Sequence, residues 1–235
     1  MKVGWKSVIA LVAIVSLACG SESAKDTPTD TTTAAPSASG DQAQGSTVVD
    51  ARPTLLIVGT SLTAGLGLDP ESAYPAILQR KIDSAGINVR VVNAGLSGET
   101  SAAALRRIEW LLRDTAAFVM LETGANDGLR GQDVDSTKAT LTAIIRRVKA
   151  IMPSAKILLA QMESPPNLGD RYTTAFRAMF PAVAREEGVE LVPFLLAGVA
   201  GVPEMNQGDG IHPNEQGAKL VAANVFRSIL PLLPR

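Results

Sequence analysis

The sequence is poor in several features, and each shortage excludes something. Its 235 residues include one cysteine, Cys19, so no disulfide can form within the chain. The 22 basic and 23 acidic residues give a formal net charge of −1, which argues against a nucleic acid or an anionic membrane surface as a partner. The chain also has a single histidine, His212. A site that needs an imidazole as its base must therefore use that residue.

The first 18 residues have the composition of an export signal. Lys2 and Lys6 precede an apolar run at Val8–Ala18, which is shorter than the roughly 20 residues that span a bilayer. We therefore interpret residues 1–18 as a signal peptide.

Cys19 follows Ser16-Leu17-Ala18 directly, a pattern that resembles the lipobox of bacterial lipoproteins, although Ser16 stands where leucine is usual. The resemblance implies cleavage before Cys19 and a diacylglyceryl group on its sulfur. The protein would then be an exported bacterial protein, anchored by lipid in the periplasm or at the outer membrane. In the alternative, an ordinary signal peptide is cut after Ala18 and Cys19 is a free thiol. We favour the lipid, because an exported protein gains nothing from one unpaired cysteine.

Residues 19–51 have almost no large apolar side chains. The stretch Ser21–Val49 consists mainly of Ser, Thr, Ala, Asp, Pro and Gln, so it cannot bury enough surface to offset the entropy lost on folding. We predict a disordered linker at 19–51 and one folded domain at 52–235.

Short apolar runs alternate with amphipathic stretches after Arg52. Apolar residues recur at helical spacing in 141–151 and in 172–183. This alternation predicts an α/β fold, with a five-stranded parallel sheet that helices cover on both faces. The predicted strands are Thr54–Val58, Val89–Val92, Phe118–Glu122, Lys156–Ala160 and Val189–Pro193.

Segments rich in glycine and polar residues follow the first three runs, where a parallel sheet binds its ligands. They are Gly59–Gly65, Asn93–Thr100 and Gly124–Gly128, and a fourth such segment, Asp209–Pro213, lies late in the chain.

Asp209 lies three residues before His212, close enough in a tight turn for its carboxylate to orient the imidazole. Ser61 follows the first predicted strand between Gly59 and Gly65, where a sharp turn could expose its hydroxyl as a nucleophile. Each feature alone has an ordinary explanation. Asp209 could cap a helix that starts near Pro213, and Ser61 or Thr60 could cap the helix after its strand.

An acyl-transfer enzyme also needs donors for the oxyanion of its transition state. Gly98 can offer its backbone N–H, Asn126 its side-chain amide, and Ser61 its own N–H. Taken singly, Gly98 could be a turn glycine and Asn126 part of an Asn-Asp turn.

Together the four segments resemble, in order and spacing, the four consensus blocks of the SGNH (GDSL-like) hydrolase superfamily. The resemblance covers about residues 54–233. It implies a three-layer α/β/α flavodoxin-like fold, a triad of Ser61, His212 and Asp209, and no cofactor or metal. It further implies an oxyanion hole formed by Ser61, Gly98 and Asn126.

The resemblance is strongest to the bacterial periplasmic arylesterase, thioesterase and lysophospholipase branch, through Ala73–Ala76, Asn93–Ser101, Asn126–Gly131 and Gly210–Asn214. It implies a small acyl-ester, aryl-ester or thioester substrate. We also expect the protein to be a monomer. The branch has a mobile substrate loop after the asparagine, and its counterpart here is Asp127, Gly128, Leu129, Arg130 and Gly131.

One position departs from the family, because Thr60 stands where aspartate usually precedes the nucleophile. This puts the rate or substrate range in doubt and leaves the triad intact. Aliphatic residues around Leu66, Leu68 and Leu129 favour longer or aromatic substrates. The alternatives are a carbohydrate or cell-wall O-deacetylase, which would use the same residues, and a non-catalytic binding lipoprotein.

Overall fold

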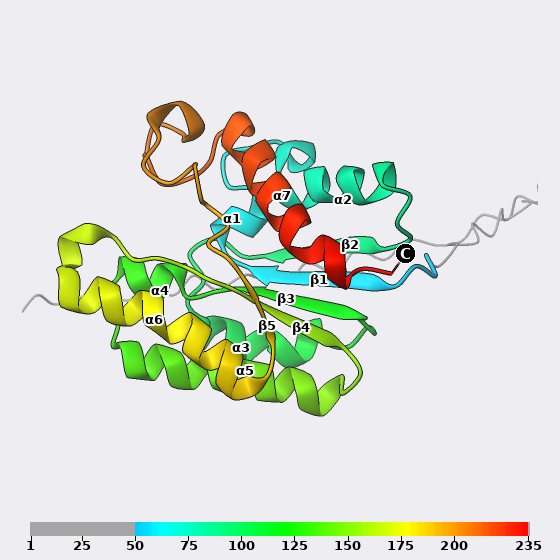
Figure 1. Ribbon diagram of the computed structural model, residues 1–235, viewed down its shortest axis with the longest axis horizontal. Helices are drawn as coiled ribbons and strands as arrows, with labels where there is room; N and C mark the ends of the chain where they lie inside the picture. The colour runs from blue at the N-terminus through cyan, green and yellow to red at the C-terminus, as the bar shows by residue number, and fades with distance from the viewer. Residues whose placement is uncertain (1–49, 235) are drawn as a thin grey trace, which may run out of the picture. The chain divides into compact units, whose positions relative to one another are not determined.

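The computed structural model of the chain describes residues 50–234. The predicted signal peptide, the lipidation site at Cys19 and all but the last residues of the predicted linker lie outside the described residues. In the described part, five parallel strands form one sheet in the order β2-β1-β3-β4-β5 (Figure 1). The strands are β1 (Thr54–Gly59), β2 (Arg90–Gly95), β3 (Phe118–Glu122), β4 (Lys156–Ala160) and β5 (Glu190–Val192). This flavodoxin-like order confirms the predicted fold class.

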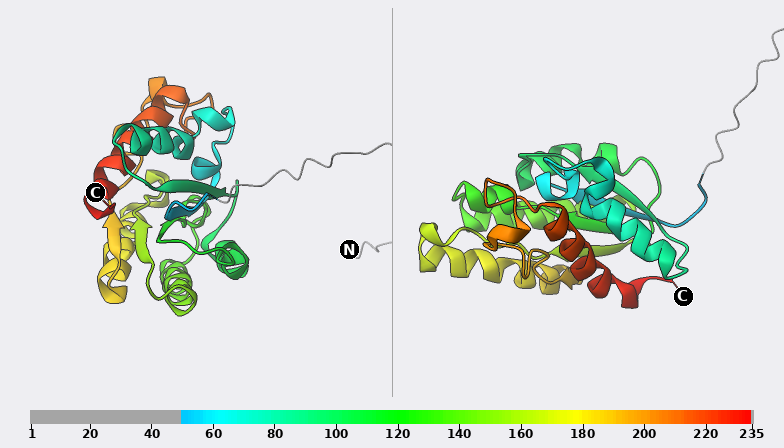
Figure 2. Two further views of the ribbon diagram at one scale, coloured as in Figure 1. Left: turned by 90° about the vertical axis from the view of Figure 1, so that its right-hand side faces the viewer. Right: turned by 90° about the horizontal axis from the view of Figure 1, so that it is seen from above.

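Helices cover both faces of the sheet, as the edge-on view shows (Figure 2). Helices α2 and α7 pack together on one face, while α3 and α6 pack against α5 on the other. The helices are α1 (Ser61–Ala64), α2 (Tyr74–Ser84), α3 (Ser101–Leu111), α4 (Ala125–Leu129), α5 (Val134–Ile151), α6 (Asp170–Glu187) and α7 (Glu215–Ile229). Short 3₁₀ turns lie at Pro70–Ser72, Pro166–Leu168, Pro203–Met205 and Leu230–Leu232. In residues 50–234, no helix has both the length and the apolar character needed to cross a membrane.

The core lies between the sheet and its two helical layers. Every residue of β1 and β3 is buried, as expected for central parallel strands that helices cover on both sides. The apolar face predicted for 141–151 is buried in α5 except at its end, where Ile151 is 41% exposed because the helix stops there.

The second strand is longer than predicted, because β2 continues through Gly95. Asn93, expected in the loop after the strand, lies within it and donates from Nδ2 to Thr63 O at 2.8 Å. At Gly95, a Cβ atom would lie 2.2 Å from the backbone nitrogen of Ala64, so only glycine lets α1 approach β2 this closely. These two contacts tie α1, which begins at Ser61, to the edge strand β2.

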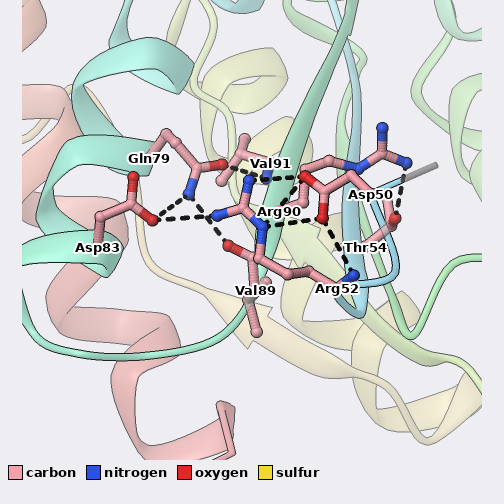
Figure 3. Close-up of polar contacts among 8 residues, drawn as sticks. All are labelled: Asp50, Arg52, Thr54, Gln79, Asp83, Val89, Arg90 and Val91. Atoms are coloured by element: carbon pink, nitrogen blue, oxygen red, sulfur yellow. Dashed lines mark hydrogen bonds and ion pairs between the residues drawn. The ribbon is translucent and has the colours of Figure 1, made fainter. Parts of the chain in front are cut away.

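Polar side chains join the starts of β1 and β2 to α2 (Figure 3). The amide of Gln79 donates to Val89 O at 3.0 Å and accepts from Val91 N–H at 2.6 Å, so it satisfies backbone groups at the free edge of β2. Arg52 binds both Asp50 and Asp83. The hydrogen bonds from the Arg52 side chain are the main reason that the pKa of Asp50 is lowered to about 2. These contacts fix the end of the sheet opposite to the loops that follow the strands.

Helix α1 follows β1 and α4 follows β3. The chain goes from β1 to β2 on one side of β1 and returns to β3 on its other side. Open α/β sheets bind ligands at such a switch point, beyond the carboxyl ends of the strands. The fold therefore places Ser61 and Asn126 in the first turns of two helices that follow neighbouring strands, at the expected ligand-binding edge.

Candidate active site

Ser61, His212 and Asp209 form one hydrogen-bonded series. The distance from Ser61 Oγ to His212 Nε2 is 2.8 Å, and His212 Nδ1 lies 2.6 Å from Asp209 Oδ2. Ser61 is the first residue of α1, and the other two residues lie in the loop before α7. This is the order of contacts in which a base can take a proton from a nucleophile while a carboxylate orients that base.

The backbone of its own turn holds Asp209. Its Oδ1 accepts hydrogen bonds from the N–H groups of Ile211, at 2.9 Å, and His212, at 3.0 Å, which leaves Oδ2 for the imidazole. The pKa of Asp209 is lowered to about 2, mainly by the backbone hydrogen bond from His212 and next by the one from Ile211. The carboxylate is therefore charged at any pH above about 4.

Asp209 does not cap the following helix. The N-cap of α7 is Asn214, whose Oδ1 accepts from Gln216 N–H at 3.0 Å and Gly217 N–H at 3.1 Å. The helix begins at Glu215, two residues later than the capping alternative assumed. That alternative is wrong, because Asn214 already satisfies the first N–H groups of the helix.

Gln207 links the histidine loop to the nucleophile's turn. Its Nε2 donates to Leu66 O at 2.7 Å and to Pro213 O at 2.9 Å, and its backbone N–H donates to His212 O at 2.7 Å. The bond to Leu66 joins residues 141 apart in sequence, and the other two hold Gln207 within the histidine loop, so together they fix the distance between His212 and Ser61. Sequence reasoning missed Gln207, since a glutamine in a glycine-rich loop gives no sign of a distant partner.

The three predicted oxyanion donors are N–H groups of Ser61, Gly98 and Asn126. The backbone N–H groups of Ser61 and Gly98 have no hydrogen-bond partner within residues 50–234. Asn126 donates one amide hydrogen to Glu99 O at 3.0 Å and keeps the second one free. Gly98 has φ of +78°, which favours glycine, and its carbonyl accepts from Arg130 Nη2 at 3.1 Å.

Glu99 and Arg107 fix the turn that carries Gly98. The carboxylate of Glu99, which is 1% exposed, accepts from Arg107 at 2.5 and 2.6 Å. Arg107 also donates to Ala94 O at 2.8 Å, so the ion pair is tied to the end of β2. The donor of Asn126 and the turn of Gly98 are thereby held in one polar network, which was not recognised from the sequence.

A cavity of about 380 Å³ opens beside Ser61. Its lining combines Ser61, Asn126 and His212 with mainly apolar side chains, among them Leu129, Met162, Phe194, Leu196 and Ile211. Gly98 is not among the lining residues. Leu66 and Leu68 line a second, smaller recess of about 10 Å³, which Ser61 and His212 also line, so of the three predicted leucines only Leu129 lines the larger cavity.

The predicted substrate loop, Asp127–Gly131, begins as helix. Helix α4 extends to Leu129, and the side chain of Asp127 is buried, where it accepts from Ser101 N–H at 2.8 Å and Ser101 Oγ at 2.6 Å. Gly128 faces the core, because a Cβ there would lie 2.8 Å from the ring of Phe176. Of the predicted loop residues, only Leu129 lines the cavity. Its mobility stays a prediction.

Glu122, the last residue of β3, was read from the sequence only as the end of a strand. It is fully buried, and its carboxylate accepts hydrogen bonds from the backbone and side chain of Thr60, directly before the nucleophile. Burial raises the pKa of Glu122 to about 7. The sequence did carry a signal for this residue, because an acidic side chain ends a run of apolar ones.

In residues 50–234, no group of three or more His, Cys, Asp or Glu side chains is arranged to hold a metal ion.

Comparison with known proteins agrees with this geometry. Residues 57–220 match the GDSL-like Lipase/Acylhydrolase family. The chain therefore belongs to this family, and its enzyme class is that of a carboxylic-ester hydrolase. The chain is 43% identical over 184 residues to "Esterase TesA" of Pseudomonas aeruginosa, which covers 78% of this chain and 90% of that protein. It is 41% identical to "Thioesterase 1/protease 1/lysophospholipase L1" of Escherichia coli K12, over 78% of this chain and 86% of that protein.

Solved structures show the same similarity. The crystal structure of TesA superposes with a TM-score of 0.73 over 77% of this chain and 99% of that one. The psychrotrophic esterase EstA from Pseudoalteromonas sp. has a TM-score of 0.73 at 35% identity, over 76% of this chain and 97% of that one. The sequence therefore identified the family and the enzyme class correctly.

Proposed function

We propose that this hydrolase cleaves esters or thioesters of medium-length acyl chains through an acyl-enzyme on Ser61. The observation that carries the proposal is the series Ser61–His212–Asp209, which opens into a mainly apolar cavity of about 380 Å³. An apolar cavity with few polar groups suits an acyl chain, since burial of each CH₂ contributes about 0.8 kcal/mol.

In the proposed reaction, His212 Nε2 takes the proton of Ser61 as Oγ attacks the acyl carbonyl. The tetrahedral oxyanion accepts hydrogen bonds from N–H groups of Ser61, Gly98 and Asn126, while Asp209 stabilises the imidazolium. The imidazolium then gives its proton to the leaving alcohol, phenol or thiol. Water attacks the acyl-enzyme by the same route, and this releases the acid and restores Ser61.

An acyl-chain series tests the proposed substrate class. We expect kcat/KM on p-nitrophenyl esters to rise from acetate to octanoate by up to roughly fourfold per methylene, which is the rate equivalent of burying one CH₂. Truncating Leu129, which lines the cavity, should weaken this rise. Leu230→Ala is the matched control, because Leu230 is similarly exposed (42% against 44%) but does not line that cavity.

A preference for acetyl esters, including acetyl-xylan, would contradict this proposal and favour the O-deacetylase alternative. The same residues would then act on a short acyl group, so the result would revise the substrate and leave the mechanism.

Asn126→Ala tests the oxyanion hole. We expect kcat to fall by on the order of 100-fold to 1,000-fold with a smaller change in KM, because the free amide hydrogen acts in the transition state. The substitution also removes the bond to Glu99 O. Arg130→Met is therefore the control, since it frees Gly98 O without removing a donor from the cavity. A change confined to KM, or an equal loss in both variants, would assign Asn126 to substrate or loop positioning only.

We also propose that the protein is exported and works as a monomer, with Cys19 lipidated and no nucleic acid partner. The basic start, the apolar run Val8–Ala18 and the lipobox-like sequence before Cys19 support export and lipidation. The intact mass of the mature protein distinguishes a lipidated Cys19 from a free thiol.

A further inference from the structure

A buried carboxylate lies behind the nucleophile. Glu122 Oε2 accepts from Thr60 N–H at 2.8 Å, Thr63 Oγ1 at 2.8 Å and, more loosely, Thr63 N–H at 3.3 Å. Its Oε1 accepts from Thr60 Oγ1 at 2.9 Å. Thr60 precedes Ser61 and Thr63 lies half a turn beyond it, so this one carboxylate holds both sides of the turn that presents the nucleophile.

The surroundings are built closely around this carboxylate. At Gly59, a Cβ atom would lie 2.7 Å from Glu122 Oε2 and 2.0 Å from Thr63 Oγ1, so any side chain there would displace the group. Tyr74 OH lies 2.8 Å from Thr63 Oγ1. Because the Thr63 hydroxyl has one hydrogen, which it donates to Glu122, Tyr74 is the donor in that second contact.

We propose that Glu122 is a positioning residue for the hydrolysis, and that only its charged form holds Ser61 in line with His212. The inference rests on the function proposed above. A carboxylate accepts all the donors that face it, whereas a carboxylic acid must itself donate with one oxygen. The Thr60 hydroxyl would then accept from Glu122 instead of donating to it, and its own hydrogen would have to turn to another partner. Thr60 lines the catalytic cavity, so the change reaches the site directly.

The charge of Glu122 changes in the pH range where such an enzyme works. Burial raises its pKa to about 7, although the hydrogen bonds from Thr60 and Thr63 lower it. The donors to the carboxylate come from Thr60, which precedes α1, and from Thr63 in α1, while Tyr74 of α2 contacts Thr63. Burial, followed by the charge of Glu122, raises the pKa of Tyr74, which keeps the phenol neutral. No cationic side chain bonds to Glu122 within residues 50–234.

The sequence, with its single histidine, predicts that the acidic limb of the kcat/KM profile reports His212 alone. With Glu122 as a second required base, activity should instead be lost in two protonation steps as the pH falls. The experiment compares wild type with Glu122→Gln and Thr60→Val between pH 5 and pH 9. It measures kcat/KM on a p-nitrophenyl ester and the rate at which a fluorophosphonate labels Ser61.

In Glu122→Gln, the amide oxygen takes the place of Oε2, and the NH₂ group faces Thr60 Oγ1 as the protonated acid would. The variant therefore mimics the uncharged form, and the misplaced turn should cost on the order of tenfold to 100-fold in rate at pH 8. Its acidic limb should keep a single step. Thr60→Val keeps the carboxylate but removes one donor to its charged form, so the Glu122 step should move to higher pH. Thr137→Val is the matched control. Thr137 of α5 is also buried, but its hydroxyl bonds only to Asp133 O, so this variant should keep the wild-type pH profile.

A second readout reports the ionisation of Glu122 without any chemistry. A pKa of about 7, above the ordinary 4.5, means that the folded protein binds more protons than the unfolded chain between these values. The free energy of unfolding contributed by Glu122 is therefore lost as the pH rises from about 4.5 to about 7. The melting temperature of wild type relative to Glu122→Gln should fall over the same range.

A single protonation step in wild type, or an unmoved acidic limb in Thr60→Val, would overturn the proposal, and the second result applies even if Glu122→Gln does not fold. Failure of the proposed function itself would give another result, namely that the fluorophosphonate does not label Ser61 in any variant at any pH.

Discussion

Ser61→Ala is expected to lower kcat by on the order of 10⁶-fold and to abolish fluorophosphonate labelling, because no other hydroxyl of the described residues bonds to the single imidazole. The fold should persist. The side chain of Ser61 makes its one hydrogen bond to His212 Nε2 at 2.8 Å, and its Oγ fills little of the core at the start of α1. Purified protein should therefore melt close to wild type while its turnover falls to background.

Ser84→Ala is the matched control for this loss. Ser84 also makes one side-chain hydrogen bond, to Arg80 O at 2.7 Å, but it lies on the exposed face of α2. Both variants lose one hydroxyl, and only Ser61→Ala should lose activity. If the probe still labels Ser61→Ala, or if turnover survives in it, another residue is the nucleophile.

The central strands were predictable because their signal is local. The runs Phe118–Glu122 and Lys156–Ala160 match β3 and β4 at both ends, since strands that helices cover on both faces show as continuous apolar runs. At the edge, β2 ends on Asn93-Ala94-Gly95, which are residues typical of turns. They belong to the strand because Asn93 binds Thr63 O and Gly95 admits α1, and both partners lie about 30 residues earlier in the chain.

The same distinction applies to the candidate site. Ser61 and Asn126 could be predicted from their positions directly after strands, and Asp209 from its spacing to His212. Asp127 was misplaced because Asn-Asp-Gly is typical of an exposed turn, whereas its partner Ser101 lies 26 residues away. Glu122 was missed because Thr60 lies 62 residues before it. Contacts between residues so far apart in sequence form only when the sheet brings their segments together, so no local sequence pattern predicts them.

Asp209→Asn separates the role of a triad carboxylate from that of a loop-holding side chain. The backbone N–H groups of Ile211 and His212 point at Oδ1, so the amide oxygen of the asparagine must take that position. Its NH₂ group then occupies the place of Oδ2, 2.6 Å from His212 Nδ1. An N–H donor there makes Nδ1 an acceptor and places the imidazole proton on Nε2, which faces Ser61.

That tautomer cannot accept the serine proton, so kcat should fall by on the order of 10⁴-fold while KM changes little. The melting temperature should change little, because the bonds to Ile211 and His212 survive. Asp133→Asn is the control, since Asp133 likewise accepts a backbone N–H, from Ser136 at 2.8 Å, at the start of α5. It should retain wild-type turnover. Near-normal kcat in Asp209→Asn would mean that this carboxylate only shapes the loop and that another group orients His212.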